Sequence, residues 1–289
     1  MKRVQLIVTG DLEKLSLHKS LARVFSDDVE FLPPIKRDGF TSATIRGSAT
    51  HGRPAKSSRT VDKLADTMLA EVEPGGRHAN PADLIFLIDD LELANSHQPR
   101  VVVEHFRDAL QLSIERRAWK TNASRTKAIR GLARRCSFHL MKPMVEAYFF
   151  GDPQALTRAG GVRRSAFLSG QDVEPFAVDD APYASVANGH RPWATADRHR
   201  HPKRYIDYLC TNPADDLSHY SSAWTYSETN HGRRALETID WGQVLANSEH
   251  ALFARALFED LAYGLDEPNP FPGACAPETS LKDGLIRNA

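Results

Sequence analysis

Short apolar runs alternate with helical periodicity over the first part of the chain. Residues 4–8 form a β-branched run that ends at Thr9 and Gly10, and apolar residues then recur at helical spacing over residues 12–25. A second run, residues 84–88, is apolar throughout, which is typical of a strand buried on both faces of a parallel sheet. The alternation predicts an α/β fold with a parallel central sheet flanked by helices.

Further elements follow from the same kind of pattern. Residues 61–72 and 101–112 show helical spacing, whereas residues 31–60 contain so many prolines and glycines that a loop insertion is expected there. One apolar stripe predicts another helix, and its residues are Ile129, Leu132, Ala133 and Cys136.

The second half of the chain is less regular. Residues 170–232 are rich in Pro, Gly, Asn, Asp and His, which predicts a long irregular insertion packed over the core. A final amphipathic helix is predicted over residues 248–263, with Ser248 as its N-cap and Gly264 as its C-terminal stop.

Composition narrows the class of protein. The 289 residues carry no net charge, so any nucleic-acid surface has to be a local patch. The three cysteines lie far apart, which argues against a zinc-thiolate site and against a disulfide framework. No signal-peptide core is found, and no apolar run approaches the roughly 20 residues that span a bilayer. We therefore expect a cytoplasmic protein that does not contact membranes.

Acidic residues follow the second apolar run directly. Asp89, Asp90 and Glu92 stand at the carboxyl end of that strand, the edge where open parallel sheets bind ligands. Side chains alternate along a strand, so Asp90 and Glu92 fall on one side and Asp89 on the other. The pair can share a hard cation such as Mg²⁺ or Mn²⁺ through oxygen ligands. The alternative is a helix N-terminus, where acids are favoured by the helix dipole.

At these residues the chain resembles the Toprim domains of topoisomerases, bacterial primases and several nucleases. Their first strand ends in Glu-Gly with an acid shortly after, and a later strand ends in Asp-x-Asp. Gly10 and Glu13 match the first motif and Asp90-x-Glu92 matches the second, but Thr9 stands at the position of the family's catalytic glutamate. The resemblance implies a Toprim-like Rossmannoid core. It also implies that Asp11 or Glu13 substitutes for the missing acid, or that the active site is degenerate.

A later segment resembles poorly characterised Toprim-like proteins that are often associated with ATPases in bacterial defence loci. The similar residues are 142–153 (KPMVEAYFFGDP) and a Pro-Lys-Arg segment at 202–204. This resemblance implies that Glu146, a lone acid in an apolar run, projects into the same crevice as Asp90 and Glu92. A buried carboxylate needs a cation or a metal, and the competing partner is Lys142, four residues earlier. Both assignments stay open at this point.

Two parts of the chain are locally basic. Lys127, Arg130 and Arg134 recur at helical spacing in a stretch with almost no acids, so they can meet consecutive phosphates of a nucleic acid. Arg200 and Arg204 belong to a second cluster, in which Trp193 and Tyr205 are candidate stacking surfaces for bases. A solvated helix face or a docking surface for an acidic partner explains such clusters equally well.

The sequence supports two hypotheses of function. In the first, the chain is a metal-dependent nuclease or related phosphotransfer enzyme. Asp90 and Glu92, with Asp89 beside them, hold Mg²⁺ or Mn²⁺, Glu13 or Glu146 completes the shell, and Lys203 or Arg204 neutralises the scissile phosphate. In the second, it is a non-catalytic Toprim-like subunit that binds nucleic acid or an ATPase partner. We expect residues 1–150 to form the core, with its insertion at 31–60, and residues 151–289 a C-terminal extension packed on that core.

Overall fold

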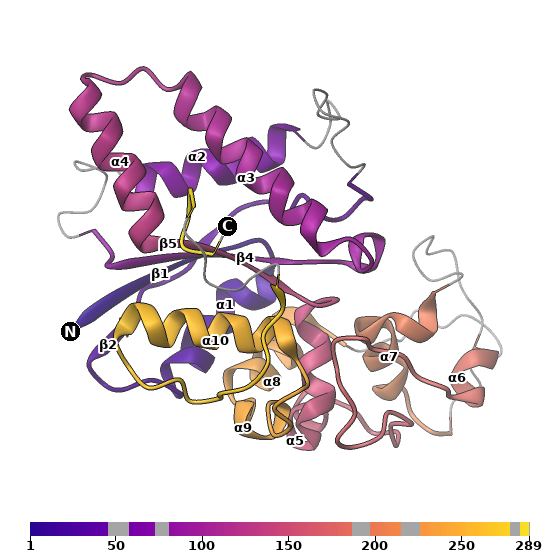
Figure 1. Ribbon diagram of the computed structural model, residues 1–289. Coiled ribbons are helices and arrows are strands. Elements are labelled where there is room, and N and C mark those ends of the chain that lie inside the picture. The colour runs from indigo at the N-terminus through magenta and orange to yellow at the C-terminus, as the bar shows by residue number, and fades with distance from the viewer. Residues whose placement is uncertain (46–57, 73–80, 187–196, 215–225, 278–283, 289) are drawn as a thin grey trace.

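The computed structural model describes residues 1–45, 58–72, 81–186, 197–214, 226–277 and 284–288. Its centre is a five-stranded sheet in the order β2–β1–β4–β5, with β3 also paired to β1 (Figure 1). All pairs are parallel. The strands are β1 (Lys2–Val8), β2 (Val29–Phe31), β3 (Ile35–Lys36), β4 (Leu84–Asp90) and β5 (Cys136–Met141). The predicted parallel sheet is therefore confirmed.

The two central strands are neighbours, with Val4 opposite Leu84 and Val8 opposite Ile88. Their carboxyl ends consequently lie at the same edge. Alternate residues face opposite sides of the sheet, and both sides are covered. Leu6 and Phe86 belong to one hydrophobic cluster, whereas Ile7, Ile85 and Leu87 belong to the other. Burial on both faces explains why residues 84–88 contain no polar residue.

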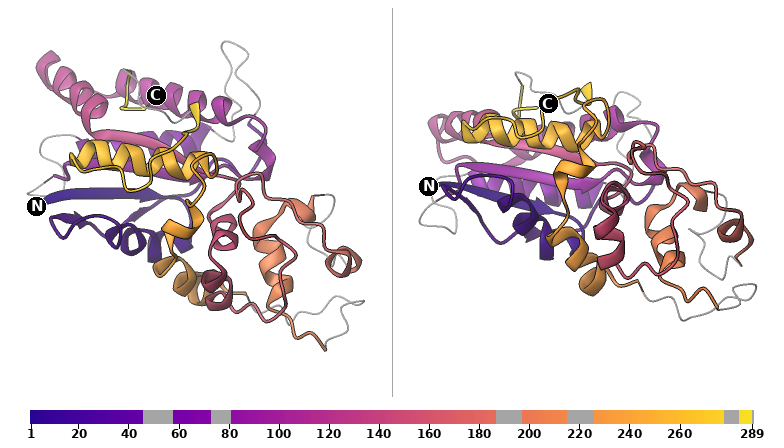
Figure 2. Two further views of the ribbon diagram at one scale, coloured as in Figure 1. Left: turned by 60° about the horizontal axis from the view of Figure 1, so that its bottom comes forward. Right: turned by 90° about the horizontal axis from the view of Figure 1, so that it is seen from below.

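Helices cover the two faces of the sheet in separate groups (Figure 1). One group is α2 (Ser58–Val72), α3 (Pro99–Arg116) and α4 (Asn122–Arg135). The other face carries α1 (Asp11–Ala22) and α10 (Leu252–Leu265). Figures 1 and 2 show that the remaining short helices lie on the side of α1 and α10, toward and beyond the carboxyl ends of the strands. These are η2 (Val145–Gly151), α5 (Pro153–Arg158), α6 (Ala181–Ser185), η4 (Arg198–Arg200), α7 (Pro202–Leu209), η5 (Glu228–Gly232), α8 (Arg233–Glu237) and α9 (Trp241–Val244); η1 (Leu93–Asn95) follows β4.

Strand β5 was not expected, and the prediction that Cys136 continues a helix is wrong. Helix α4 ends at Arg135, and Cys136 begins the strand. The strand is concealed in the sequence because it contains two buried polar residues, Ser137 and His139. Both contact the carboxylate of Asp260 on α10: the Ser137 hydroxyl donates to it, and His139 Nε2 lies 3.0 Å from Asp260 Oδ2. Arg287 completes the cluster by pairing with the same carboxylate.

The predicted bounds of the last helix are also wrong. Helix α10 begins at Leu252, after Ala251 in a left-handed conformation (φ 51°), so Ser248 is not its N-cap. The cap comes from a distant residue, since the carboxylate of Glu174 accepts hydrogen bonds from the backbone of Phe253 (2.9 Å) and Ala254 (3.0 Å). Gly264 lies within the helix rather than after it. A Cβ atom there would approach Leu84 of β4 to 2.7 Å, so the glycine permits close packing.

The region expected to be irregular holds a well-packed helix. In α7 every residue from Arg204 to Leu209 is buried. Its apolar side chains, including Tyr205 and Ile206, join the hydrophobic cluster that also contains Leu6 and Phe86. The described residues include no helix that is long and apolar enough to cross a membrane.

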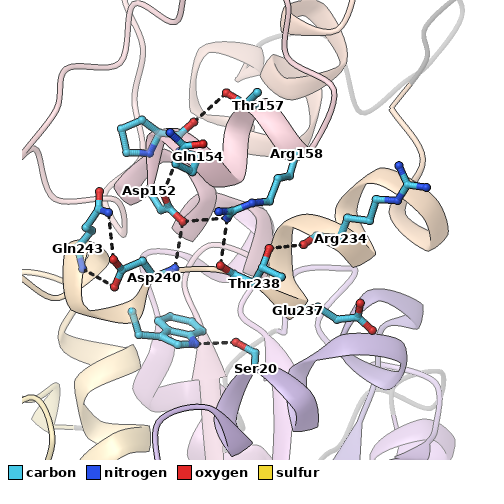
Figure 3. A network of polar contacts seen from close by, with 12 residues as sticks. Ser20, Asp152, Gln154, Thr157, Arg158, Arg234, Glu237, Thr238, Asp240 and Gln243 are labelled. Carbon is cyan, nitrogen blue, oxygen red and sulfur yellow. Dashed lines mark hydrogen bonds and ion pairs between the residues drawn. The ribbon is translucent and has the colours of Figure 1, made fainter.

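A buried polar network connects the C-terminal segments to α1 (Figure 3). The carboxylate of Asp152, fully buried just after η2, accepts a hydrogen bond from the backbone of Asp240 (3.0 Å) and pairs with Arg158 (3.5 Å). Next to Asp240, the indole N–H of Trp241 donates to Ser20 of α1 (2.7 Å). The network thus fixes η2 against α1, and both of these elements carry residues of the site described below.

The cluster around Asp260 gives a first prediction. Replacing Asp260 with Ala leaves Arg287 buried and unpaired, and we expect a loss of about 3–5 kcal/mol in the free energy of unfolding, measured by urea denaturation. The control is Glu104→Gln, which removes an exposed ion pair with Arg100, where pairs contribute only about 0.3–0.5 kcal/mol. Equal effects of the two substitutions would show that the cluster does not hold α10 and the C-terminal segment on β5.

Candidate functional site

A cavity of about 450 Å³ lies at the carboxyl edge of the sheet. Five of its lining side chains are acidic, and they come from α1, β4 and the turn after it, η2 and η5. They are Glu13, Asp90, Glu92, Glu146 and Glu228. His201 and Lys203, at the start of α7, line the same cavity. We call it the acidic cavity. Among its residues are five that the sequence singled out: Glu13, Asp90, Glu92, Glu146 and Lys203.

Asp89 and Asp90, the last two residues of β4, face opposite sides as strand alternation requires, and Glu92 follows in the turn. Asp90 and Glu92 line the acidic cavity, and Asp90 Oδ1 accepts a hydrogen bond from the backbone of Val145 (2.9 Å). Asp89 is buried and does not line the cavity. Its Oδ1 accepts a hydrogen bond from the hydroxyl of Thr9. Thr9 therefore supports Asp89 from the neighbouring strand.

Glu13 is the acid from the first motif that reaches the acidic cavity. It occupies the third position of α1, where glutamate often folds back over the N-cap. Here it lies so close to Gly10 that a Cβ atom at position 10 would stand 1.9 Å from Glu13 Oε2. Asp11 instead pairs with Lys36 (2.6 Å) at an exposed position. Of the two candidate substitutes for the missing glutamate, the structure thus brings only Glu13 into the cavity.

Glu146 is buried, with 3% of its surface exposed. Its carboxylate accepts a hydrogen bond from the hydroxyl of Tyr226 (3.4 Å). Lys142, the partner considered from the sequence, has its ammonium group 5.3 Å from the centre of the Phe253 ring. Among the ion pairs of the described residues, none joins Lys142 to Glu146. The lone acid of this apolar run therefore faces the cavity rather than its neighbour in sequence.

Lys203 supplies positive charge to the acidic cavity. Its ammonium forms an ion pair with Glu228, and its charge offsets part of the rise that burial causes in the pKa values of Glu13, Glu92 and Glu146. Among the described lining residues, this one lysine faces five acids. Lys203 can therefore balance at most one of the five carboxylates when they are ionised.

Burial and mutual repulsion both act on the acids. Burial raises the pKa of Glu13 to about 8, and the charges of Glu146 and Asp89 add to the effect. Burial followed by repulsion from Glu146 raises the pKa of Glu92 to about 7. The pKa of Asp90 is raised well above its ordinary value by burial and then by Glu13 and Glu92, and burial raises the pKa of Glu146 as well. Perturbed acids that gather in a cavity are characteristic of functional sites.

The backbone at Glu92 is strained. Its φ of 61° and ψ of 155° lie in a region that is essentially restricted to glycine and costs on the order of 1–3 kcal/mol for other residues. Hydrogen bonds hold the turn, since Leu91 N donates to Met141 O (2.8 Å) and Glu92 N donates to Pro143 O (2.7 Å). A glutamate at this position directs its side chain into the acidic cavity at the expense of local stability.

The donor set of the acidic cavity suits a hard divalent cation. All of its acids offer carboxylate oxygens, the ligands that Mg²⁺ and Mn²⁺ prefer, and the cysteines lie elsewhere. Within the described ranges, no three His, Cys, Asp or Glu side chains already stand in the arrangement of a complete metal shell. Asp90 and Glu92, two residues apart in the chain, are the residues that the sequence predicted to hold such an ion, and both line the cavity.

None of the five residues predicted to bind nucleic acid lines this cavity. Lys127, Arg130 and Arg134 are exposed on α4, which lies where the strands begin, at the opposite end of the sheet (Figure 1). Arg204 is 2% exposed and pairs with Asp207 (3.7 Å), so its guanidinium is not at the surface. Arg200 is exposed in η4.

The proposed stacking residues do not form a platform. Tyr205 is completely buried, with no face open to a base. Trp193 lies outside the described residues. Sequence reasoning also missed two residues that contact charged side chains of the cavity: Glu228, which pairs with Lys203, and Tyr226, which contacts Glu146. Neither follows a strand or shows a periodic pattern, so only the tertiary structure brings them here.

The raised pKa values predict how stability depends on pH. Glu13 and Glu92 in the metal-free folded protein hold protons up to about pH 8 and pH 7, whereas in the unfolded chain they release them near the ordinary value of 4.5. The folded state therefore binds more protons in this window, and the free energy of unfolding should fall as pH rises from about 4.5 to 8. The measurement is urea denaturation in EDTA across this range. A triple variant, Glu13→Gln, Asp90→Asn and Glu92→Gln, should show a flatter pH profile than the parent; a parent that gained stability relative to this variant with rising pH would contradict the assignment.

The strained turn gives a separate prediction. Glu92→Gln removes the charge and keeps a side chain on the strained backbone, whereas Glu92→Gly removes both the charge and the strain. We expect the glycine variant to be more stable than the glutamine variant by about 1 kcal/mol, because relief of about 1–3 kcal/mol of strain is partly offset by the flexibility of glycine in the unfolded chain. Thermal and urea denaturation of the two variants in EDTA measure the difference. A less stable glycine variant would show that the turn is not strained.

Comparison with known proteins identifies neither a family nor a function for the chain. Neither the protein-family models nor the curated proteins nor the solved structures contain a match to the chain.

Proposed function

We propose that the chain is a metal-dependent nuclease, or a related enzyme of phosphodiester chemistry, with a Toprim-like active site. The observation that carries the proposal is the meeting of Glu13, Asp90, Glu92 and Glu146 with Lys203 in one cavity. These residues come from four separate segments, and a packing role explains none of them, since buried like charges oppose folding. The parallel sheet and the position of the cavity at its carboxyl edge also fit a Toprim-like core.

In this proposal Asp90 and Glu92 hold one Mg²⁺ or Mn²⁺. When bound, such a cation acidifies water and offsets the negative charge that develops on a phosphate. The two carboxylates would hold the cation beside the ends of the strands, and the hydrogen bond from Val145 N fixes the orientation of Asp90. Repulsion among the metal-free acids makes a divalent cation a favourable counter-charge.

Glu13 and Glu146 provide proton transfer in the same cavity. A carboxyl group with a pKa of about 8, as in Glu13, exchanges protons near neutral pH and suits a general acid or base. The Tyr226 hydroxyl donates to Glu146 and orients its carboxylate. Lys203 neutralises a phosphate oxygen in this proposal, and its ion pair with Glu228 sets the position of its ammonium group.

A second candidate is a non-catalytic subunit that binds nucleic acid or an ATPase partner, as in the defence-associated proteins that the chain resembles. Thr9 favours this alternative, because it binds Asp89 instead of presenting a carboxylate to the cavity. The lack of a complete metal shell among the described side chains favours it as well. A nuclease assay decides between the two candidates.

The test compares the parent with Asp90→Asn/Glu92→Gln and with Asp11→Asn as a matched control. Asp11 is an acid near the site that pairs with Lys36 outside the cavity. We expect saturable binding of Mg²⁺ and Mn²⁺ by calorimetry, a metal-dependent rise in melting temperature, and cleavage of single- or double-stranded DNA or RNA, all lost in the double variant and kept in the control. The double variant should melt near or above the metal-free parent, since a repulsive pair has been neutralised.

The outcomes separate the two candidates. A parent that binds metal and cleaves nucleic acid supports the enzyme. A parent that binds no metal and cleaves nothing, also in the presence of an associated ATPase, rejects the enzyme in favour of the binding subunit. Cleavage that survives in the double variant would place the chemistry at other residues.

A further inference from the structure

A second cavity, of about 320 Å³, adjoins the acidic cavity and has the opposite charge. Lys142, Arg200 and His97 line it, and we call it the basic cavity. They belong to three separate segments, after β5, in η4 and after η1. Arg200 and His97 are exposed, so the cavity opens to solvent.

The two cavities stand back to back across a thin wall. Three chain segments each contribute two neighbouring residues to this wall. In each pair below, the first residue lines the acidic cavity and the second lines the basic cavity. The pairs are Glu92 and Leu93, Met144 and Pro143, and His201 and Arg200. The hydrogen bond from Glu92 N to Pro143 O (2.7 Å) joins two of these segments within the wall. Only the thickness of a single chain segment therefore separates a ligand in one cavity from the other cavity.

The charges of the basic cavity are available to a ligand. Among the described residues neither Lys142 nor Arg200 forms an ion pair with a carboxylate; the ammonium of Lys142 lies over the Phe253 ring. One acid, Glu174, also lines the cavity. Its oxygens already accept hydrogen bonds from the Tyr148 hydroxyl and from the backbone at the start of α10, where the helix dipole offsets negative charge.

We propose that the basic cavity binds a backbone phosphate of a nucleic-acid strand whose next phosphodiester lies in the acidic cavity. The inference rests on the proposed function, because it assigns the position of that substrate. Arg200 offers a planar fork of N–H donors and Lys142 a point charge, the two groups that proteins use for phosphate. The basic cavity supplies the attraction that an acidic metal site cannot supply for a polyanion, and it fixes the strand relative to Asp90 and Glu92.

The test measures binding of a fluorescent single-stranded oligonucleotide in EDTA over a series of salt concentrations. Each cation that neutralises a phosphate of a single strand adds about 0.7 to the slope of log K against log salt, so Lys142→Ala/Arg200→Ala should make the slope shallower by about 1.4 and weaken binding about tenfold or more. The matched control is Arg107→Ala/Arg234→Ala, which removes the same charge from exposed positions elsewhere and should leave the slope unchanged. Lys142→Gln/Arg200→Gln serves where the alanine variant does not fold.

This assay contains no metal, so it separates the two proposals. If the protein binds no Mg²⁺ but shows the expected change in slope, the proposed phosphate site in the basic cavity is supported and the proposed enzyme function is rejected. An unchanged slope in the Lys142/Arg200 variants overturns the inference, whatever the metal experiments show. Competition with inorganic phosphate distinguishes the source of the ligand. Displacement of the fluorescent oligonucleotide only by an unlabelled strand supports the proposal. Equal displacement by free phosphate, at the same concentration of phosphate groups, assigns the cavity to a small anion instead.

Discussion

Repulsion among buried carboxylates is the constraint on which the site depends. Parallel strands that end at one edge bring Asp90 and Glu92 next to the first turn of α1, and η2 adds Glu146 from beyond the sheet. Each acid is desolvated, and their pKa values are raised accordingly. The structure tolerates this arrangement because the stabilising contacts lie elsewhere: in two hydrophobic clusters, in the Asp260 cluster and in the Asp152 network.

The charge of the molecule is divided between the two ends of the sheet. Acids dominate the cavity at the carboxyl edge, whereas the exposed bases of α4 lie where the strands begin. A net charge of zero hides this separation, because it averages two opposite local potentials. A polyanion that binds α4 and one that enters the cavity would therefore occupy different faces. The basic cavity, in contrast, brings positive charge next to the acids.

Sequence reasoning succeeded where one short pattern of residues indicates both an element of the fold and the candidate site. The apolar run of residues 84–88 predicted a buried parallel strand, and alternation placed Asp90 on the side opposite Asp89, whereas Glu92 reaches the cavity through the turn after the strand. It failed where distant residues decide the local structure. Strand β5 is stabilised by Asp260, and α10 begins where Glu174 caps it. Glu228 reaches the cavity through a segment without periodicity, so no pattern in the chain could identify it.

The contact between Gly10 and Glu13 has a consequence for how related sites can be recognised. A side chain at position 10 would occupy the space of the Glu13 carboxylate, so the present position of that carboxylate depends on the glycine. Thr9, in contrast, lies outside the cavity and is free of this restriction. A glycine followed three residues later by glutamate, directly after a β-branched strand, is thus the signature to seek in other chains. An acid before the glycine is not required for this geometry.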